Sequence, residues 1–376
     1  MKIALVHDWL THLGGAERVL IALHKISPEA PIYTLFYDKK FASEYLPRAK
    51  IIPSFLQKIP NIKKLHPWFK VLMPLVVESF DLSEFDLVIS SNHEFSHGIL
   101  VKQDSKHICY YHSPSRILWD RTHEYVRDFK ERGRSGFKLS LIKLGQHLLR
   151  LSDWSAGQRP DIVIANSNHV AERIKKYYGR EVRVIYPPVN TIANRQSLIA
   201  NFKFQNYFLI VSQLYPHKNI DLAVETFKNL PEFNLIIAGE GPEKKHLKKL
   251  VGESGNIKLV SFVPDEELSF YYQNCLAYLI CNEEDFGISP IEAMSFGKPV
   301  LAYNAGGATE TVLEGITGEF FYKLKQDELA EAIKSIDRKI RDGRYNKEAI
   351  GKYSKKFSFE RFKKEILDIL GDLKYN

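Results

Sequence analysis

The chain has 376 residues, of which 44% are hydrophobic and 26% are charged, and its formal net charge is +8. This length predicts about two domains, and the composition is that of an ordinary globular protein. The sequence has no run of about 18 uncharged apolar residues, so a membrane-spanning helix is not expected. The first run, "MKIALVHDWL", reaches an acid at Asp8 and suits a buried strand, not a signal peptide.

The cysteines and the charge indicate the compartment and the partners. Cys109, Cys275 and Cys281 have neither metal-ligand nor disulfide-framework spacing, which indicates reduced thiols in a cytoplasmic protein. Residues 1–190 hold 28 Lys and Arg against 19 Asp and Glu, whereas the remainder holds 25 against 26. An excess in one half indicates a surface that meets nucleic acid, an anionic bilayer or phosphorylated substrates.

Short apolar runs alternate with helical stretches along the whole chain. Most of the runs are continuous in Val, Ile, Leu and Tyr, as expected for parallel strands that are buried on both faces. The predicted strands are Lys2–Val6, Asp86–Ser90, His107–His112, Asp161–Asn166, Val182–Tyr186, Tyr207–Val211, Asn234–Ala238, Ile257–Phe262, Ala277–Cys281 and Val300–Tyr303. Helices at Gly15–Lys25, Val170–Tyr178 and Asp221–Leu230 complete βαβ units, and a last helix at Ser358–Leu373 has no strand after it.

The pattern pauses once, at "IYPPVNTIANRQS", which is a reasonable linker. The prediction is therefore an α/β protein with two doubly wound, Rossmann-like domains that face each other across a cleft, with ligands at the carboxyl ends of the strands. The expected parts are residues 1–195, residues 196–355 and a C-terminal helix, 356–376, that returns to the first domain.

Two loops could bind parts of a ligand. Gly14 and Gly15 precede a helix, so their amides could face an anion, although a plain connecting turn is the better interpretation of two glycines alone. In "EEDFGISPIEAMSFGKPV", Ser289 is the expected N-cap and Pro290 the first helical residue, so that Glu292 falls in the first turn. Glu284 and Glu292 would then project at the mouth of the sheet, where carboxylates can accept hydrogen bonds from a polyol such as ribose or a hexose.

The whole arrangement resembles the retaining glycosyltransferases of family 4, two-domain GT-B enzymes that use nucleotide-sugar donors. Their Glu-x7-Glu motif is matched by "EDFGISPIE", and further matches are "GGAERV", "ANSNHVAERIKKYYG", "IYPPV", "AGEGPEKKHL" and "EAMSFGKPVLAYNAGGATETV". The segments "HDWLTHLGGAERV" and "HSPSRILWDRTHEY" are most similar to mannosyltransferases that assemble bacterial surface polysaccharides.

The resemblance implies roles for particular residues. Glu292 would hold the ribose hydroxyls and Glu284 the hydroxyls of the donor sugar, with Phe286, Gly287 and Ile288 between them in the same donor site. Gly15, and Gly14 with it, would offer amides to the diphosphate, and His112 would orient the sugar. The donor is expected to be a co-substrate, GDP-mannose, and no cofactor is expected.

The family commonly places an arginine and a lysine after the first strand of its second domain. Here "VSQLYPHKN" has Lys218 for the lysine but Gln213 for the arginine, and a neutral amide cannot neutralise leaving-group charge. Either Lys218 and backbone amides suffice, or another base such as Arg116 contributes, or the chain is a weak enzyme.

No acid in the matched segments is an obvious nucleophile, and Asp120 and Glu124 near His112 stay unassigned. The resemblance implies front-face substitution, in which the departing phosphate takes the acceptor proton. No Asp-x-Asp pair occurs, so no metal is expected, and Lys218 with helix N-termini would stabilise the diphosphate.

The acceptor site is expected in the basic half. In "FKLSLIKLGQHLLRL" one helical face carries Phe137, Leu141, Leu144, Leu148 and Leu151, and another carries Lys143, Gln146, His147 and Arg150. Core packing is the commoner use of such a helix. A lipid-diphosphate-linked acceptor would need a basic amphipathic surface, so peripheral contact with the inner face of the cell membrane is predicted.

Four other functions compete with this one. An NAD-dependent oxidoreductase would need a G-x-G-x-x-G fingerprint, which is absent, and no recognised nucleic-acid-binding motif occurs. A transferase that uses a UDP-sugar and a non-catalytic nucleotide-sugar-binding protein stay open as alternatives.

Overall fold

The computed structural model describes residues 1–131, 136–189, 204–261 and 263–375. The chain divides into two compact units, of which unit 1 is Met1–Pro188 with Lys363–Asn376 and unit 2 is Val189–Phe362. The boundary expected near residue 195 lies outside the described residues, as does Phe262 at the end of one predicted strand.

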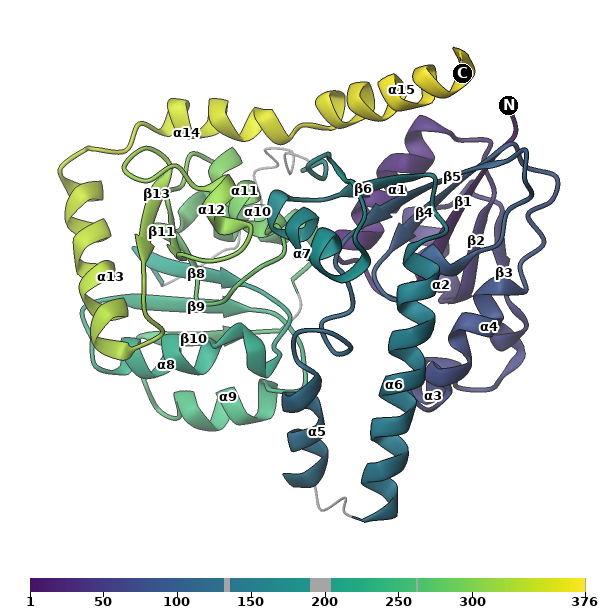
Figure 1. Ribbon diagram of the computed structural model, residues 1–376. Helices are drawn as coiled ribbons and strands as arrows, with labels where there is room; N and C mark the ends of the chain where they lie inside the picture. The colour runs from purple at the N-terminus through teal and green to yellow at the C-terminus, as the bar shows by residue number, and fades with distance from the viewer. Residues whose placement is uncertain (132–135, 190–203, 262, 376) are drawn as a thin grey trace. The chain divides into compact units, whose positions relative to one another are not determined.

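Unit 1 is built on a seven-stranded parallel sheet in the order β3-β2-β1-β4-β5-β6-β7 (Figure 1). The register places Leu5 of the first strand opposite Ile32, and Ile3 opposite Leu87. The strands are β1 (Ile3–Leu10), β2 (Ile32–Tyr37), β3 (Ile51–Pro53), β4 (Leu87–Asn92), β5 (Lys106–Tyr111), β6 (Ile162–Ala165) and β7 (Arg183–Val184). Of these, β2 and β3 were not among the predicted strands.

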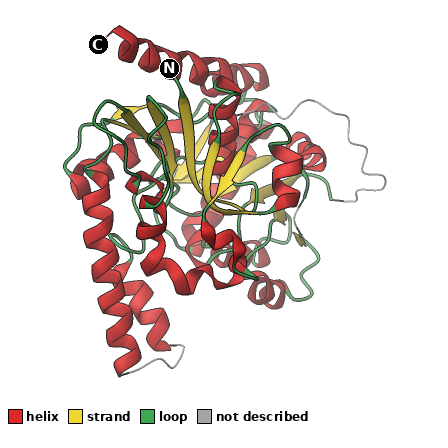
Figure 2. Ribbon diagram, turned by 90° about the vertical axis from the view of Figure 1, so that its right-hand side faces the viewer, coloured by secondary structure: helices red, strands yellow, loops and turns green. Residues whose placement is uncertain are grey.

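Among the helices of unit 1, α7 begins and ends at residues with clear capping roles. The Ser167 hydroxyl accepts a hydrogen bond from the Val170 N–H at the start of α7, and the left-handed Gly179 ends that helix. Figures 1 and 2 show α5 and α6 side by side as a hairpin that extends away from the sheet. The helices are α1 (Gly15–Ile26), α2 (Lys39–Tyr45), α3 (Ile62–Phe69), α4 (Met73–Glu78), α5 (Thr122–Glu131), α6 (Phe137–Gly157), α7 (Asn168–Tyr178) and α15 (Phe359–Tyr375), which starts in unit 2.

Unit 2 has a six-stranded parallel sheet in the order β10-β9-β8-β11-β12-β13. Its strands are β8 (Tyr207–Val211), β9 (Asn234–Ala238), β10 (Ile257–Val260), β11 (Ala277–Ile280), β12 (Val300–Tyr303) and β13 (Gly318–Phe321), the last of which was not predicted. Its helices are α8 (Ile220–Lys228), α9 (Lys244–Val251), α10 (Asp265–Asn274), α11 (Ile288–Ser295), α12 (Ala308–Thr311), α13 (Gln326–Arg341) and α14 (Lys347–Ser354).

Alternate residues of the unit 2 strands pack into two different apolar cores. Phe208 and Ile210 of β8 pack with residues of α8, α9 and α13, whereas Tyr207 and Leu209 pack with residues of α10, α11 and α14. Both faces of the sheet are therefore covered, which explains the continuous apolar runs in the sequence. The predicted doubly wound architecture is confirmed in both units, and ligands of such sheets bind at the carboxyl ends of the strands.

None of the helices in the described part of the chain is both long enough and apolar enough to cross a lipid bilayer.

Candidate active site

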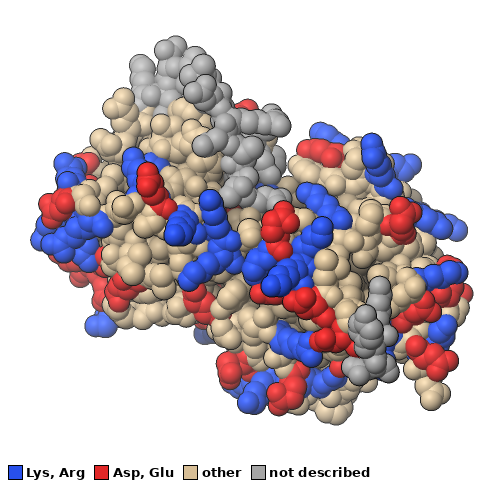
Figure 3. All heavy atoms as spheres, turned by 90° about the horizontal axis from the view of Figure 1, so that it is seen from above, with Lys and Arg blue, Asp and Glu red and all other residues tan. Residues whose placement is uncertain are grey.

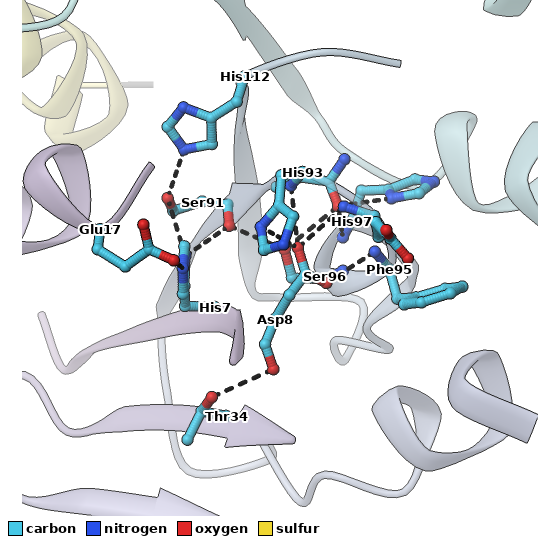
Figure 4. A network of polar contacts seen from close by, with 12 residues as sticks. His7, Asp8, Glu17, Thr34, Ser91, His93, Phe95, Ser96, His97 and His112 are labelled. Carbon is cyan, nitrogen blue, oxygen red and sulfur yellow. Dashed lines mark hydrogen bonds and ion pairs between the residues drawn. The ribbon is translucent and has the colours of Figure 1, made fainter. Parts of the chain in front are cut away.

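Polar side chains gather at the carboxyl edge of the unit 1 sheet (Figure 4). His7 and Asp8 lie in the second half of β1, Ser91 lies near the end of β4, and His112 directly follows β5. Because these three strands are parallel neighbours, their carboxyl ends bring the four side chains to one edge.

Asp8 is a fully buried carboxylate that binds the loop after β4. Its Oδ2 accepts the backbone N–H groups of residues 93 and 94 at 2.9 and 3.0 Å, and its Oδ1 accepts those of residues 95 and 96 at 2.7 and 2.8 Å. Burial alone would raise the pKa of Asp8, but the charge of His93 and these hydrogen bonds lower it well below the usual value. Asp8 is therefore ionised and fixes the loop.

His93 carries the positive charge that balances Asp8. Its Nδ1 lies 3.0 Å from Asp8 Oδ2, and its side chain is 23% exposed. Burial would lower the pKa of His93, but the negative charges of Asp8, Glu17 and Glu94 raise it to about 9. An imidazolium is therefore present at this edge of the sheet at neutral pH.

At the N-terminus of α1 the Glu17 side chain caps the residue before the helix, and because that residue is a glycine this contact is only half of a capping box. The N–H of Gly14 donates to Glu17 Oε2 at 2.9 Å, while Glu17 Oε1 lies 3.6 Å from His7 Nε2. Burial would raise the pKa of Glu17, but its contact with His7 lowers it to about 2. In this structure Glu17 thus occupies the Gly14 amide expected to face a diphosphate, whereas Gly15 lies in the first turn, where an N–H has no intrahelical acceptor.

His112 is neutral and held in place. Its Nε2 lies 2.8 Å from Ser91 Oγ, and its carbonyl accepts a hydrogen bond from Asn166 Nδ2 at 2.8 Å. Burial, followed by the positive charges of His7 and His93, lowers the pKa of His112 to about 3.

The two unassigned acids near His112 already have cationic partners. Asp120 contacts Arg173 and Tyr177, and Glu124 forms an ion pair with Arg121 at 2.7 Å. Because both carboxylates are engaged in these contacts, neither is positioned as a nucleophile in this structure.

In unit 2 the helix after β11 begins earlier than predicted. The expectation that Ser289 is the N-cap and Pro290 the first helical residue was wrong, because α11 starts directly after Gly287. Gly287 adopts a φ of 90°, which favours glycine and turns the chain early. Pro290 is then tolerated as the third helical residue, since first-turn N–H groups lack intrahelical acceptors, and Glu292 lies in the second turn.

Glu284 lies in the acid loop, defined as residues 281–287, and contacts the expected cation. Its Oε1 is 2.7 Å from Lys218 Nζ, with the two side chains 26% and 16% exposed. Two glycines hold the loop by close backbone contact. The Gly307 N–H donates to the Glu284 carbonyl at 2.8 Å, and a Cβ on Gly306 would lie 2.2 Å from that oxygen.

Glu292 is only 4% exposed and has a tyrosine partner. Its Oε2 accepts a hydrogen bond from the Tyr272 hydroxyl at 2.8 Å. Burial and then the charge of Glu292 hold the pKa of Tyr272 well above its usual value, so the hydroxyl keeps its proton. Glu292 is therefore an ordered, ionisable group behind the acid loop.

The remaining predicted donor-site residues contribute less through their side chains. Phe286 is 3% exposed and packs against Phe357 at 5.7 Å between ring centroids, so only its backbone can meet a ligand. Ile288 is partly exposed at the start of α11, and Gln213 is exposed in the loop after β8.

Each unit brings several predicted residues together. In unit 1 a chain of contacts runs from His112 through Ser91, His7 and Glu17 to Gly14, and in unit 2 the lysine and the first acid are paired. The predicted site residues did not include His7, Asp8, Ser91, His93 or Tyr272. An acid inside an apolar strand, as in "ALVHDWL", is a signal that could have identified Asp8. Within the described ranges, no group of three His, Cys, Asp or Glu side chains is arranged to hold a metal ion.

Two family models match the chain almost from end to end. Residues 13–192 match "Glycosyltransferase Family 4", and residues 194–356 match "Glycosyl transferases group 1". The α-1,3/1,6-mannosyltransferase ALG2 of Candida glabrata is 26% identical, with 83% of this chain and 78% of the relative covered. An uncharacterized glycosyltransferase of Methanocaldococcus jannaschii is also 26% identical, with 96% and 95% covered.

Solved structures share the fold. HepE of Anabaena, solved in complex with UDP, superposes with a TM-score of 0.69 at 20% identity over 99% of this chain and 100% of that chain. WaaG, a glycosyltransferase of lipopolysaccharide biosynthesis, superposes with a TM-score of 0.69 at 15% identity over 98% and 99%.

Proposed function

Because this chain is a family 4 glycosyltransferase with the GT-B fold, we propose that it moves mannose from GDP-mannose, with retention, to a glycan or lipid-linked acceptor in surface polysaccharide synthesis. Mannose is supported by the name of its ALG2 relatives. The complexes of HepE with UDP and UDP-glucose make a UDP-sugar the second candidate donor.

The observation that carries the proposal is the Lys218–Glu284 ion pair at the carboxyl edge of the unit 2 sheet. When the donor binds, Lys218 would form an ion pair with the donor diphosphate in place of Glu284. The Glu284 carboxylate would then accept hydrogen bonds from hydroxyls of the donor sugar. Glu292 would take the ribose hydroxyls, and Tyr272 would hold its carboxylate in position. These residues are half-buried or buried, so their interactions with the donor are weakly screened by solvent.

The transfer step needs positioning and charge more than a covalent intermediate. Asp120, Glu124 and Glu284 all form ion pairs, which argues against a double displacement through one of them. In front-face substitution the bond from the anomeric carbon to the phosphate breaks on the face where the acceptor oxygen attacks. The acceptor proton passes to the departing phosphate, and Lys218 stabilises the charge that develops.

Replacing Gln213 with arginine tests whether the cationic clamp is incomplete. The side chain is exposed in the loop after β8, so the larger residue fits without repacking. A large gain in turnover for Gln213→Arg would mean that the native clamp is deficient. Unchanged turnover would mean that Lys218 and backbone amides suffice.

The donor site is tested by titrating GDP-mannose, UDP-glucose and ADP-glucose into wild type, Glu292→Ala and the control Glu283→Ala, whose side chain is exposed. Loss of hydrogen bonds to a charged group should weaken donor binding at least about tenfold in Glu292→Ala alone. Unchanged donor affinity and sugar transfer in that variant would refute the proposed site. Donor hydrolysis without acceptor separates an enzyme from a non-catalytic binder.

Peripheral binding to the inner face of the cell membrane is supported by the solvent-exposed side of α6. Its apolar stripe, predicted from the sequence, is exposed by 47% to 77% and consists of Phe137, Leu141, Leu144, Leu148 and Leu151. Gln146 and Asp153, each 6% exposed, lie on the opposite side of the helix and face the protein. Core packing therefore does not account for the stripe, and large exposed apolar patches commonly mark interaction surfaces.

The positive excess of the first half provides an attraction for anionic lipid. On the face drawn in Figure 3, Lys and Arg are interspersed with Asp and Glu, so no single basic patch covers that face. Sedimentation with phosphatidylglycerol vesicles at physiological salt tests the contact. We expect pelleting of wild type and of the control Leu367→Glu, which changes an exposed leucine on α15, and loss of pelleting in Leu144→Glu. Equal pelleting of both variants, or no pelleting of wild type, would refute the proposed membrane contact.

A further inference from the structure

One hydrogen-bonded path in unit 1 reaches His112 from below (Figure 4). His7 Nδ1 lies 3.0 Å from the Ser91 carbonyl and 3.2 Å from Ser91 Oγ, and Ser91 Oγ lies 2.8 Å from His112 Nε2. His7 and Ser91 are 1% and 0% exposed, so water does not replace either partner.

The donors and acceptors of this path have one consistent assignment. A carbonyl oxygen can only accept, so His7 Nδ1 must carry the hydrogen that it shares with the Ser91 carbonyl. Ser91 Oγ, beside the same N–H, is then an acceptor toward His7. If it also accepted from His112, its own hydrogen would be buried with no acceptor among the described residues, so that hydrogen points to His112 Nε2. Because a neutral imidazole carries one hydrogen, the hydrogen of His112 is on Nδ1.

We propose that Ser91 is a positioning residue that fixes His112 as the Nδ1–H tautomer and thereby makes it a hydrogen-bond donor, not a base. The lone pair on Nε2 is occupied by the Ser91 hydroxyl, so neither ring nitrogen has a free lone pair for the acceptor proton. Nδ1 makes no hydrogen bond to any residue in the described ranges, and its N–H is available to a hydroxyl of the donor sugar. Only this last step rests on the proposed function; the tautomer is a property of the free protein.

Ser90 provides a matched comparison within the same strand. It is also 0% exposed and hydrogen-bonded to a histidine, with its Oγ 2.7 Å from His107 Nε2. Adjacent residues of a strand point to opposite faces, so a change at Ser90 leaves the His7–Ser91–His112 path intact. The two serines therefore separate an effect on His112 from a general effect of losing a buried hydroxyl.

The test is the tautomer of His112, measured from long-range proton–nitrogen correlations in histidine-labelled protein near neutral pH, with His112→Gln to assign the signal. Wild type should show a protonated Nδ1 and a bare Nε2. Ser91→Ala should shift His112 toward the Nε2–H form, Ser91→Thr should keep the wild-type tautomer, and Ser90→Ala should change His107 alone. With an active donor, Ser91→Ala should also lower kcat/KM by about fivefold, the effect of one neutral hydrogen bond, with Ser91→Thr restoring it.

A protonated Nε2 in wild type overturns the inference, and so does an unchanged tautomer in Ser91→Ala. If Ser91→Ala does not fold, the wild-type and Ser91→Thr spectra still decide the assignment. The expected tautomer without sugar transfer from any donor supports the inference and refutes the proposed function, so the two failures are distinguishable.

Discussion

His93 should make the stability of unit 1 depend on pH in the neutral to alkaline range. Its pKa rises from 6.5 to about 9 on folding because of the carboxylates of Asp8, Glu17 and Glu94, the first of which contacts its ring. A raised pKa means that the folded state holds the proton more tightly than the unfolded state. The stabilisation is complete below pH 6.5 and is lost as the pH rises through 9. A rise of this size corresponds to about 3 kcal/mol, lost at about 1.4 kcal/mol per pH unit.

Tryptophan fluorescence reports this loss for unit 1 specifically, because all four tryptophans of the chain lie there: Trp9, Trp68, Trp119 and Trp154. Urea unfolding of wild type and His93→Gln should differ by about 3 kcal/mol near pH 6 and by little above about pH 9. Buried thiols and tyrosines also favour unfolding at high pH, so the difference between the two proteins isolates His93.

The control for this experiment is His66→Gln. The His66 ring lies 5.1 Å from the ring of Trp9, close to the 4.7 Å of His93, but the pKa of His66 is lowered by burial. Its substitution should therefore change the stability by an amount that stays constant above pH 6.5. A constant difference between wild type and His93→Gln across the same range would refute the assignment of a His93 imidazolium beside Asp8.

Three further outcomes are expected. Gly306→Ala should destabilise unit 2 and weaken donor binding far more than Gly315→Ala. Both glycines have a positive φ, but only at Gly306 would an added Cβ collide with backbone atoms. Thermal unfolding and donor titration compare the two variants. Tyr272→Phe should destabilise the protein by about 1.5–3 kcal/mol, because it removes the hydrogen bond to the Glu292 carboxylate. The loss should be larger than for Tyr207→Phe, because the Tyr207 hydroxyl donates to a neutral carbonyl. Urea unfolding followed by circular dichroism measures both losses, and equal losses would contradict the role of the carboxylate. Transfer should continue at full rate in excess chelator, and abolition with rescue by magnesium would overturn the metal-independent mechanism.

The sequence predicted the strands of unit 2 best. Tyr207–Val211, Asn234–Ala238 and Val300–Tyr303 have the predicted bounds, because strands buried on both faces are continuous apolar runs with abrupt ends. The strand Ile51–Pro53 is too short to give such a run, and Gly318–Phe321 is interrupted by Glu319, whose carboxylate accepts a hydrogen bond from a tyrosine. Ile32–Tyr37 has an apolar run as clear as the others, so its sequence contained the signal.

The site was predicted in part because its contacts are of two kinds. The Glu-x7-Glu motif and the glycine turn are local in sequence, and both lie at the carboxyl ends of strands. The contacts of Asp8 join residues more than 80 positions apart and exist only because β1 and β4 are neighbours in the sheet. Strand order does not follow from apolar periodicity, so the Asp8–His93 pair could not be derived from the pattern alone.

Helix α6 also shows that apolar periodicity alone does not determine tertiary contacts. Its apolar stripe was predicted correctly, but the natural assumption that an apolar side packs inward fails here. The residues that contact the buried side of α6 are polar partners of Asp153. Its Oδ2 accepts hydrogen bonds from Trp119 Nε1 at 2.7 Å and from the Tyr178 hydroxyl at 2.8 Å, and its Oδ1 lies 3.5 Å from His97. A buried carboxylate satisfied in this way is compatible with the core, which leaves the leucines on the outside. Periodicity identifies the faces of a helix, and the partners that tertiary contacts provide decide which face is buried.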